Sequence, residues 1–105
     1  MSKGENNMTY KLLPDVFYCV ESVEIIENNV PRKELQARLT KNSKEELYTT
    51  SNCQLGGVLA IDALVNKSLQ NITDIVADVQ SQLPNADSNL IKEFLDELVE
   101  FGWLG

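Results

Sequence analysis

The stretch that decides the fold is SNLIKEFLDELVEFGWL, residues 88–104. Its apolar residues recur with the spacing of one face of an α-helix, at positions 90, 91, 94, 95, 98 and 99. The other face carries four carboxylates: Glu93, Asp96, Glu97 and Glu100. Asp87 or Ser88 is suited to cap the start of this helix, and Gly102 is suited to end it. We therefore expect an amphipathic helix followed by a short apolar tail, Trp103-Leu104, that folds back.

Two further helices are expected before this one. Asn71 is a natural N-cap, and the apolar residues after it keep helical spacing as far as Pro84. An earlier apolar helix covers residues 55–65. Gly56 and Gly57 near its start each cost about 1 kcal/mol of helix propensity relative to Ala. That cost indicates either a close packing contact or a helix that begins just after the two glycines.

The first half of the chain has the composition of a small antiparallel sheet. Residues 16–20 predict a strand, and residues 23–26 either continue it or form another. Residues 35–40 alternate apolar and polar side chains, as a half-buried strand does, although a short helix over residues 33–39 is an alternative. Residues 45–50 follow a polar turn and are expected to form the third strand, paired with the second.

The chain of 105 residues is expected to form one domain. We predict a flexible tail over residues 1–9, a single domain over residues 10–105, and a break in the sheet at residues 28–31. The predicted class is α+β, with a small N-terminal antiparallel sheet followed by three α-helices. This is the layout of a winged helix-turn-helix.

The charge balance argues against nucleic acid as the ligand. The formal net charge is −7, and residues 55–105 hold eight acidic side chains against only two basic ones, Lys67 and Lys92. Nucleic-acid binding depends on Lys and Arg neutralising phosphates, and an anionic membrane surface attracts the same residues. We therefore expect no nucleic acid and no membrane among the partners, but a ligand that is neutral to basic.

Residues suited to catalysis or metal binding are scarce. The chain has no His, and its two cysteines, Cys19 and Cys53, are far apart in sequence. A zinc site needs three or four N, S or O ligands, and an activated nucleophile usually needs a His base. We expect no catalytic residue, no metal and no cofactor, so an enzyme is not predicted. The polar N-terminus and the absence of a long apolar run predict a cytoplasmic location with reduced thiols.

One motif weakly suggests an acyl carrier. Asp87-Ser88-Asn89-Leu90 is similar to the carrier signature Asp-Ser-Leu, in which the Ser receives phosphopantetheine. Asn89 interrupts the triplet, however, and only 17 residues follow Ser88. A helix cap is therefore the favoured interpretation of Asp87 and Ser88.

Four consecutive features of residues 46–105 belong together. They are a strand with a polar turn (ELYTTSN, 46–52), a helix (LGGVLAIDAL, 55–64), a capped helix (ITDIV, 72–76) and an apolar helix with Gly and a tail (IKEFLDELVEFGWL, 91–104). This order resembles the PqqD-like peptide-recognition domains, which serve pathways that modify ribosomally synthesised peptides. The resemblance implies a winged helix-turn-helix that does not bind DNA.

The resemblance also implies where a ligand lies. Members of the family hold the leader segment of a precursor peptide as an added strand along the third strand, in a groove closed by the third helix. An exposed strand edge offers unpaired backbone groups for such binding. On this sequence the implied peptide-binding residues are Glu46, Leu47, Tyr48, Thr49, Thr50, Leu90, Ile91, Phe94, Leu95 and Leu98.

The expected function is therefore non-catalytic. The resemblance implies that the protein binds a leader segment and delivers it to a maturation enzyme, of the radical S-adenosylmethionine type. The alternative is a regulatory module that binds another protein through its last helix, without a peptide substrate. Residues 23–44 are longer than the usual hairpin of the family, and residues 21–44 are a candidate contact surface for the partner enzyme.

Overall fold

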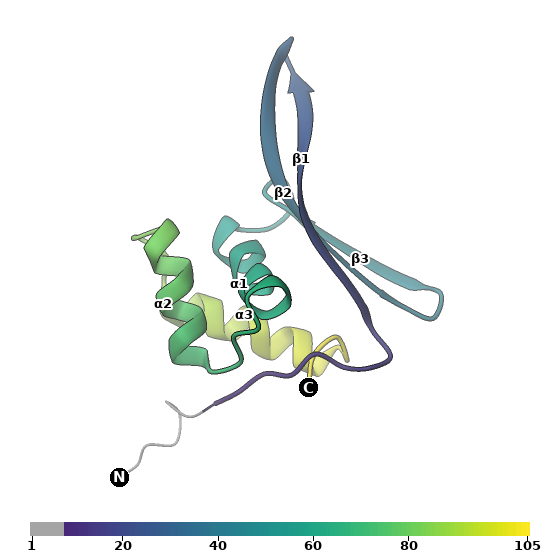
Figure 1. Cartoon of the computed structure of the whole chain (residues 1–105), viewed down its shortest axis with the longest axis vertical. Coiled ribbons are helices and arrows are strands. Elements are labelled where there is room, and N and C mark those ends of the chain that lie inside the picture. The colour runs from purple at the N-terminus through teal and green to yellow at the C-terminus, as the bar shows by residue number, and fades with distance from the viewer. Residues whose placement is uncertain (1–7) are drawn as a thin grey trace.

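The computed structural model describes residues 8–105 and places three strands before three helices (Figure 1). The strands pair antiparallel in the order β1-β2-β3. This confirms the predicted α+β arrangement of a small sheet followed by three helices. The elements are β1 (Phe17–Glu27), β2 (Val30–Lys41), β3 (Lys44–Thr49), α1 (Leu55–Asn66), α2 (Ile72–Gln82) and α3 (Ser88–Glu100).

The β1-β2 hairpin is longer and more continuous than the sequence predicted. Residues 23–26 continue β1, and the proposed helix over residues 33–39 is wrong because all of them lie in β2. The break at residues 28–31 shrinks to a turn at Asn28 and Asn29, with φ of 54° and 64°. Such angles suit two-residue hairpin turns, and Asn tolerates them. Pairing therefore continues through Pro31 to the end of the hairpin.

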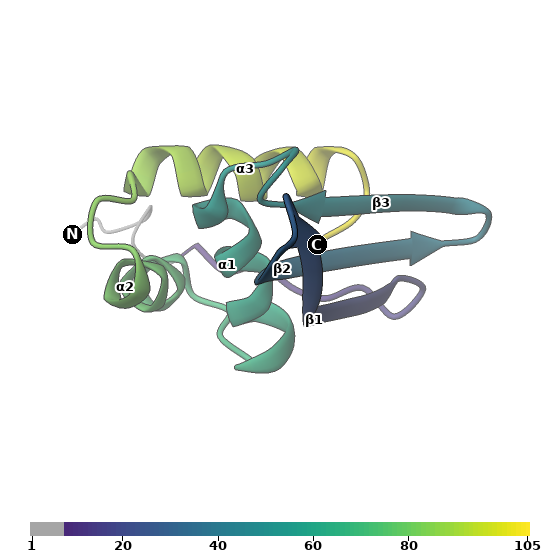
Figure 2. The same cartoon turned by 90° about the horizontal axis from the view of Figure 1, so that it is seen from above.

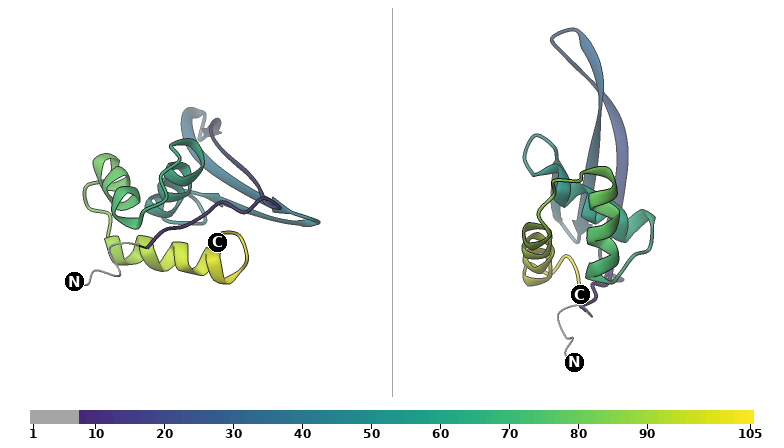
Figure 3. Two further views of the ribbon diagram at one scale, coloured as in Figure 1. Left: turned by 60° about the horizontal axis from the view of Figure 1, so that its bottom comes forward. Right: turned by 90° about the vertical axis from the view of Figure 1, so that its left-hand side faces the viewer.

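β3 pairs with only one half of β2, the half that is farther from the β1-β2 turn. Pairing between β2 and β3 ends at Gln36 and Thr49, whereas pairing between β1 and β2 continues to the turn. Residues 22–35, here called the arm, thus form a two-stranded ribbon. Figure 3 shows its outer end well away from the helices. Because β3 ends at Thr49, Thr50 lies in the following turn and not in the strand where it was expected.

Helix α1 is the centre of the core. It contacts all three strands as well as α2 and α3, and Val58, Ala60 and Ala63 are fully buried. A helix that is apolar on most of its sides belongs inside a domain. The sheet contributes Ala37 and Leu39 from the face that the helices cover.

The caps predicted from sequence are confirmed. The Asn71 side chain accepts from the backbone N–H of Thr73 at 2.8 Å. Asp87, not Ser88, caps α3, because its Oδ1 accepts from the backbone N–H of Asn89 at 2.8 Å. Gly102 has φ of 86° and ends the last turn, after which Trp103 and Leu104 are buried.

The two ends of the described chain are joined. Lys11 and Gly105 exchange two backbone hydrogen bonds of 2.9 and 2.8 Å. The Tyr10 hydroxyl donates to Asp96 Oδ1 at 2.6 Å, which fastens the N-terminal segment to α3. The Met8 carbonyl accepts from Ile72 N–H, and Thr9 bridges to Asn71, so Met8 and Thr9 belong to the domain. The rest of the expected tail, residues 1–7, lies outside the described residues.

Candidate functional site

A cavity of about 450 Å³ opens between the start of α1, the loop before α3 and the first half of α3. Its apolar lining comes from three separate parts of the chain: Leu55, Leu83, Ala86, Leu90, Ile91 and Phe94. Three carboxylate residues also line it: Asp87, Glu93 and Glu97. Apolar cavities of this size with a few polar groups are the usual form of a ligand site.

The glycine pair shapes the floor of this cavity. A β-carbon on Gly57 would lie 3.1 Å from both Cys53 Sγ and Phe94 Cδ2, whereas one on Gly56 would meet its neighbours only at 3.9 Å or more. Without a side chain at Gly57, the Phe94 ring lies directly against α1. The close-contact explanation is thus confirmed for Gly57 but not for Gly56, and α1 begins before both glycines, at Leu55.

An aromatic pair connects the cavity to the sheet. The rings of Tyr48 and Phe94 meet edge to face, with centroids 5.3 Å apart and planes at 88°. Tyr48 lies on β3 and Phe94 on α3, so this ring contact joins the two elements. Figure 2 shows the end of β3 close to α3 in that view. Burial, together with the nearby carboxylates of Glu46 and Glu97, raises the pKa of Tyr48 to about 12. The Tyr48 hydroxyl therefore stays protonated throughout the physiological range.

The outer edge of β3 is unpaired by any strand among residues 8–105. The side chain of Asn52 binds part of this edge. Its Nδ2 donates to the Leu47 carbonyl at 2.8 Å, and its Oδ1 accepts from Thr49 N–H at 2.8 Å. A peptide group of an added strand makes the same two kinds of bond, so the Asn52 carboxamide takes the place of a strand partner at this end of the edge.

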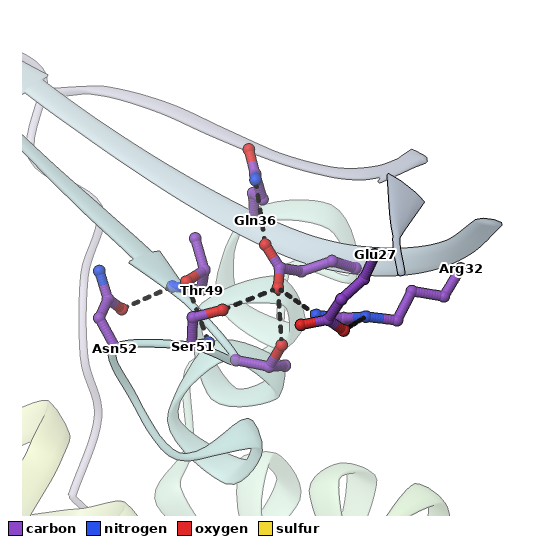
Figure 4. A network of polar contacts seen from close by, with 8 residues as sticks. Glu27, Arg32, Gln36, Thr49, Ser51 and Asn52 are labelled. Carbon is purple, nitrogen blue, oxygen red and sulfur yellow. Dashed lines mark hydrogen bonds and ion pairs between the residues drawn. The ribbon is translucent and has the colours of Figure 1, made fainter. Parts of the chain in front are cut away.

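Hydrogen bonds to Glu34 hold the turn that carries Asn52. Figure 4 shows Gln36, Ser51 and Arg32 in the same polar network. Its carboxylate accepts from Thr50 Oγ1 at 2.9 Å, from Ser51 Oγ at 3.3 Å and from Gln36 Nε2 at 3.2 Å, and it lies 3.7 Å from the Arg32 guanidinium. These hydrogen bonds, with the one from Gln36 the largest cause, hold the pKa of Glu34 below its ordinary value. The network joins the base of the arm to the end of β3.

The expected site residues separate into two groups. Leu90, Ile91 and Phe94 line the cavity, although Ile91 is only 3% exposed and also serves the core. Leu95 and Leu98, at 0% and 2% exposure, belong to the core and do not line the cavity. They were expected in the groove wall because all five share one apolar stripe, but α1 covers the part of that stripe on which Leu95 and Leu98 lie.

The expected strand residues are also divided. Glu46 and Tyr48 pair with Leu39 and Ala37, so they lie on the face of the sheet that the helices cover. Leu47 lies on the opposite face and is 38% exposed. Thr49 is buried at the end of the strand, and Thr50 binds Glu34. None of these five residues lines the cavity itself, but the Tyr48 ring contacts Phe94, which does.

Sequence reasoning missed several residues of the site. The start of α1 and the loop before α3 were not predicted to contribute. Glu93 and Glu97 are exposed, as their place on the polar face of α3 predicts, and they also line the cavity. The unfavourable glycine pair was the one signal for a close approach near Gly57. Nothing in the sequence indicated that Asn52 binds the edge of β3, because this contact depends on how the turn at residues 50–53 lies against the strand.

Residues 8–105 contain neither a candidate metal site nor a helix that could span a membrane. Within residues 8–105, no three His, Cys, Asp or Glu side chains are grouped so as to hold a metal ion. None of the helices in this part of the chain has the length and apolar character required to cross a bilayer. Cys19 and Cys53 are both free thiols.

Comparison of the chain with known protein families, with curated proteins and with solved structures finds no match.

Proposed function

We propose that this protein recognises the leader segment of a ribosomally synthesised precursor peptide and delivers it to a maturation enzyme, without catalysing a reaction itself. The proposal is supported by a sequence resemblance and by the arrangement of β3 in the structure. The resemblance of residues 46–105 to PqqD-like domains implies binding along the third strand, and the third strand here has an open edge beside a cavity.

The observation that carries the proposal is the contact between Tyr48 and Phe94. It brings the open edge of β3 next to an apolar cavity of about 450 Å³. In β-strand addition, backbone hydrogen bonds provide affinity, and pockets for alternate side chains provide specificity. The open edge of β3 and the cavity, joined through the contact between Tyr48 and Phe94, would supply these two requirements.

Asn52 indicates which bonds an added strand would make. Its carboxamide binds the Leu47 carbonyl and the Thr49 N–H, both on the open side of β3. A peptide that pairs with the whole edge replaces these two bonds with its own. A shorter pairing along the first half of β3 leaves Asn52 in place.

The partner and the location are further parts of the proposal. The resemblance suggests a maturation enzyme of the radical S-adenosylmethionine type, and the protein would act in the cytoplasm, where precursor peptides are made. The arm, within residues 21–44, is the candidate surface for that enzyme, because its outer end extends away from the three helices (Figure 1).

Isothermal titration of the full chain with the leader of the precursor encoded beside its gene tests the proposal. We expect binding with a Kd well below about 100 μM, which corresponds to a free energy of about −5.5 kcal/mol. No heat of binding at that concentration would refute leader recognition. Binding of the neighbouring enzyme without any peptide requirement would favour the regulatory module instead.

A further inference from the structure

Four carboxylate residues on β3 and around the cavity form no ion pair in the described chain, although Glu45, also on β3, pairs with Arg38 at 3.2 Å. Six acidic residues of the described chain form ion pairs with Lys or Arg: Asp15, Glu27, Glu34, Glu45, Asp78 and Asp96. Outside the site, Glu21, Glu24, Asp62, Asp74 and Glu100 form none in that part of the chain. Within residues 8–105, none of Glu46, Asp87, Glu93 or Glu97 has a Lys or Arg nitrogen within 4.0 Å. The site therefore keeps a negative potential that no side chain of the described chain neutralises.

The register of β3 locates this charge relative to the cavity. Glu46 and Tyr48 are two residues apart and share the face that the helices cover. Tyr48 contacts Phe94 in the cavity wall. The carboxylates of both Glu46 and Glu97 act on the Tyr48 hydroxyl. An acidic position and an apolar position thus lie next to each other along β3.

A peptide strand added to β3 is constrained by this alternation. A residue directly opposite Glu46 has its Cβ about 4.5–5.5 Å from that of Glu46, and opposite charges in such pairs are stabilising. The residue two positions away in the peptide lies opposite Tyr48 and points to the same face, because strand side chains repeat with period two. That second residue lies beside Phe94 and the cavity.

We infer that the site selects a peptide in which an apolar residue is separated by one residue from a Lys or Arg. The apolar side chain enters the cavity beside Phe94, and the cation lies between Glu46 and Glu97. This inference rests on the proposed function and names the chemistry of the segment that the same site binds. The net charge of −7 adds a long-range attraction for basic peptides.

Peptide display against the full chain tests this directly. A library of random extended peptides is selected on the purified protein, and the recovered sequences are aligned. We expect enrichment of an apolar residue two positions from Lys or Arg. Binding of a recovered peptide should weaken by about two- to fivefold for each of Glu46→Gln and Glu97→Gln, since partly exposed ion pairs are of modest strength. Salt should also weaken it, through screening.

A matched control separates local from general charge effects. Asp74→Asn on α2 and Glu100→Gln on α3 remove exposed carboxylates that form no ion pair within residues 8–105 and do not line the cavity. They lower the net negative charge by the same amount as the site variants. The inference predicts that these two changes leave the affinity of the recovered peptide within about twofold, because screening limits long-range effects.

The outcomes distinguish the inference from the proposed function. Recovered peptides with the apolar and basic pair, weakened only by the site variants, support the inference. Recovered peptides without Lys or Arg, or peptides weakened equally by the control pair, overturn the inference but leave peptide recognition standing. If no peptide is enriched, and the leader itself does not bind, both the inference and the proposed function fail.

Discussion

Apolar side chains are exposed at the tip of the arm and buried in the core of the body of the protein. In the arm, Ile26 and Val30 are 75% and 61% exposed, whereas in the body, which comprises the rest of the sheet and the three helices, Leu95 and Val79 are fully buried. A two-stranded ribbon is marginally stable by itself. The arm therefore depends on its turn, its backbone pairing and the Glu34 network, while the body depends on hydrophobic burial. The two parts of this short chain are therefore stabilised in different ways.

The largest expected contrast is between core and arm truncations. Leu95→Ala should lower the free energy of unfolding by about 2–5 kcal/mol, because it leaves a cavity among α1 and α3. Ile26→Ala, at the tip of the arm, should change it by less than about 0.5 kcal/mol. Urea denaturation of both variants measures the difference. A large loss from Ile26→Ala would show that the arm tip is part of the cooperative core.

The next effect concerns the β3 edge. Asn52→Ala removes the carboxamide that occupies the Leu47 carbonyl and the Thr49 N–H. If a bound leader pairs with these groups, it no longer has to displace Asn52, and its Kd should fall by about two- to tenfold, the equivalent of one ordinary hydrogen bond. Titration of the variant with the leader measures this. An unchanged Kd would mean that the peptide pairs only with the first half of β3.

The two glycines of α1 give a smaller, paired effect. Gly56→Ala places its β-carbon in ordinary contact and should raise the free energy of unfolding by about 0.4–1 kcal/mol. Gly57→Ala gains the same helix propensity but pushes on Cys53 and Phe94 at 3.1 Å, so its stability should gain less and its peptide affinity should fall. Thermal unfolding and peptide titration of both variants measure this. Equal affinities would argue that Phe94 is not at the peptide site.

The smallest effect is local to the arm and depends on pH. The hydrogen bonds to Glu34 hold its folded pKa below the ordinary value of 4.5. The ionised network therefore stabilises the fold above pH 4.5, and this contribution is lost as the pH falls through the lowered folded pKa. Amide NMR signals of the arm should change over that window. In Glu34→Gln the change should be absent, while the signals of α1 stay constant in both proteins.

Much of the fold could be predicted because its signals are local. The stripe of α3 and the caps at Asn71, Asp87 and Gly102 depend on residues a few positions apart, and all were found from sequence. The element order followed from the same patterns. The helix alternative over residues 33–39 failed because the long β1-β2 pairing, a tertiary effect, outweighed the local preference of that segment.

The site was less predictable because it depends on which segments meet. Leu90 and Leu95 share one apolar stripe, yet only the arrangement of α1 against α3 decides that Leu90 is 47% exposed and Leu95 is buried. Glu93 and Glu97 lie on the polar, exposed face of α3 that the sequence predicted, but only the arrangement of the segments shows that they also line the cavity. The pairing of Lys11 with Gly105 likewise joins residues from opposite ends of the chain.

The most direct test of the central claim uses the two native thiols. Cys53 lines the cavity, whereas Cys19 lies on the sheet face that the helices leave open. Alkylation of both residues is followed by peptide mass mapping, with and without saturating leader peptide. We predict that the leader slows the alkylation of Cys53 several-fold and leaves that of Cys19 unchanged. Protection of Cys19 alone, or of neither cysteine while the leader is bound, would contradict a peptide site at the β3 edge and its cavity.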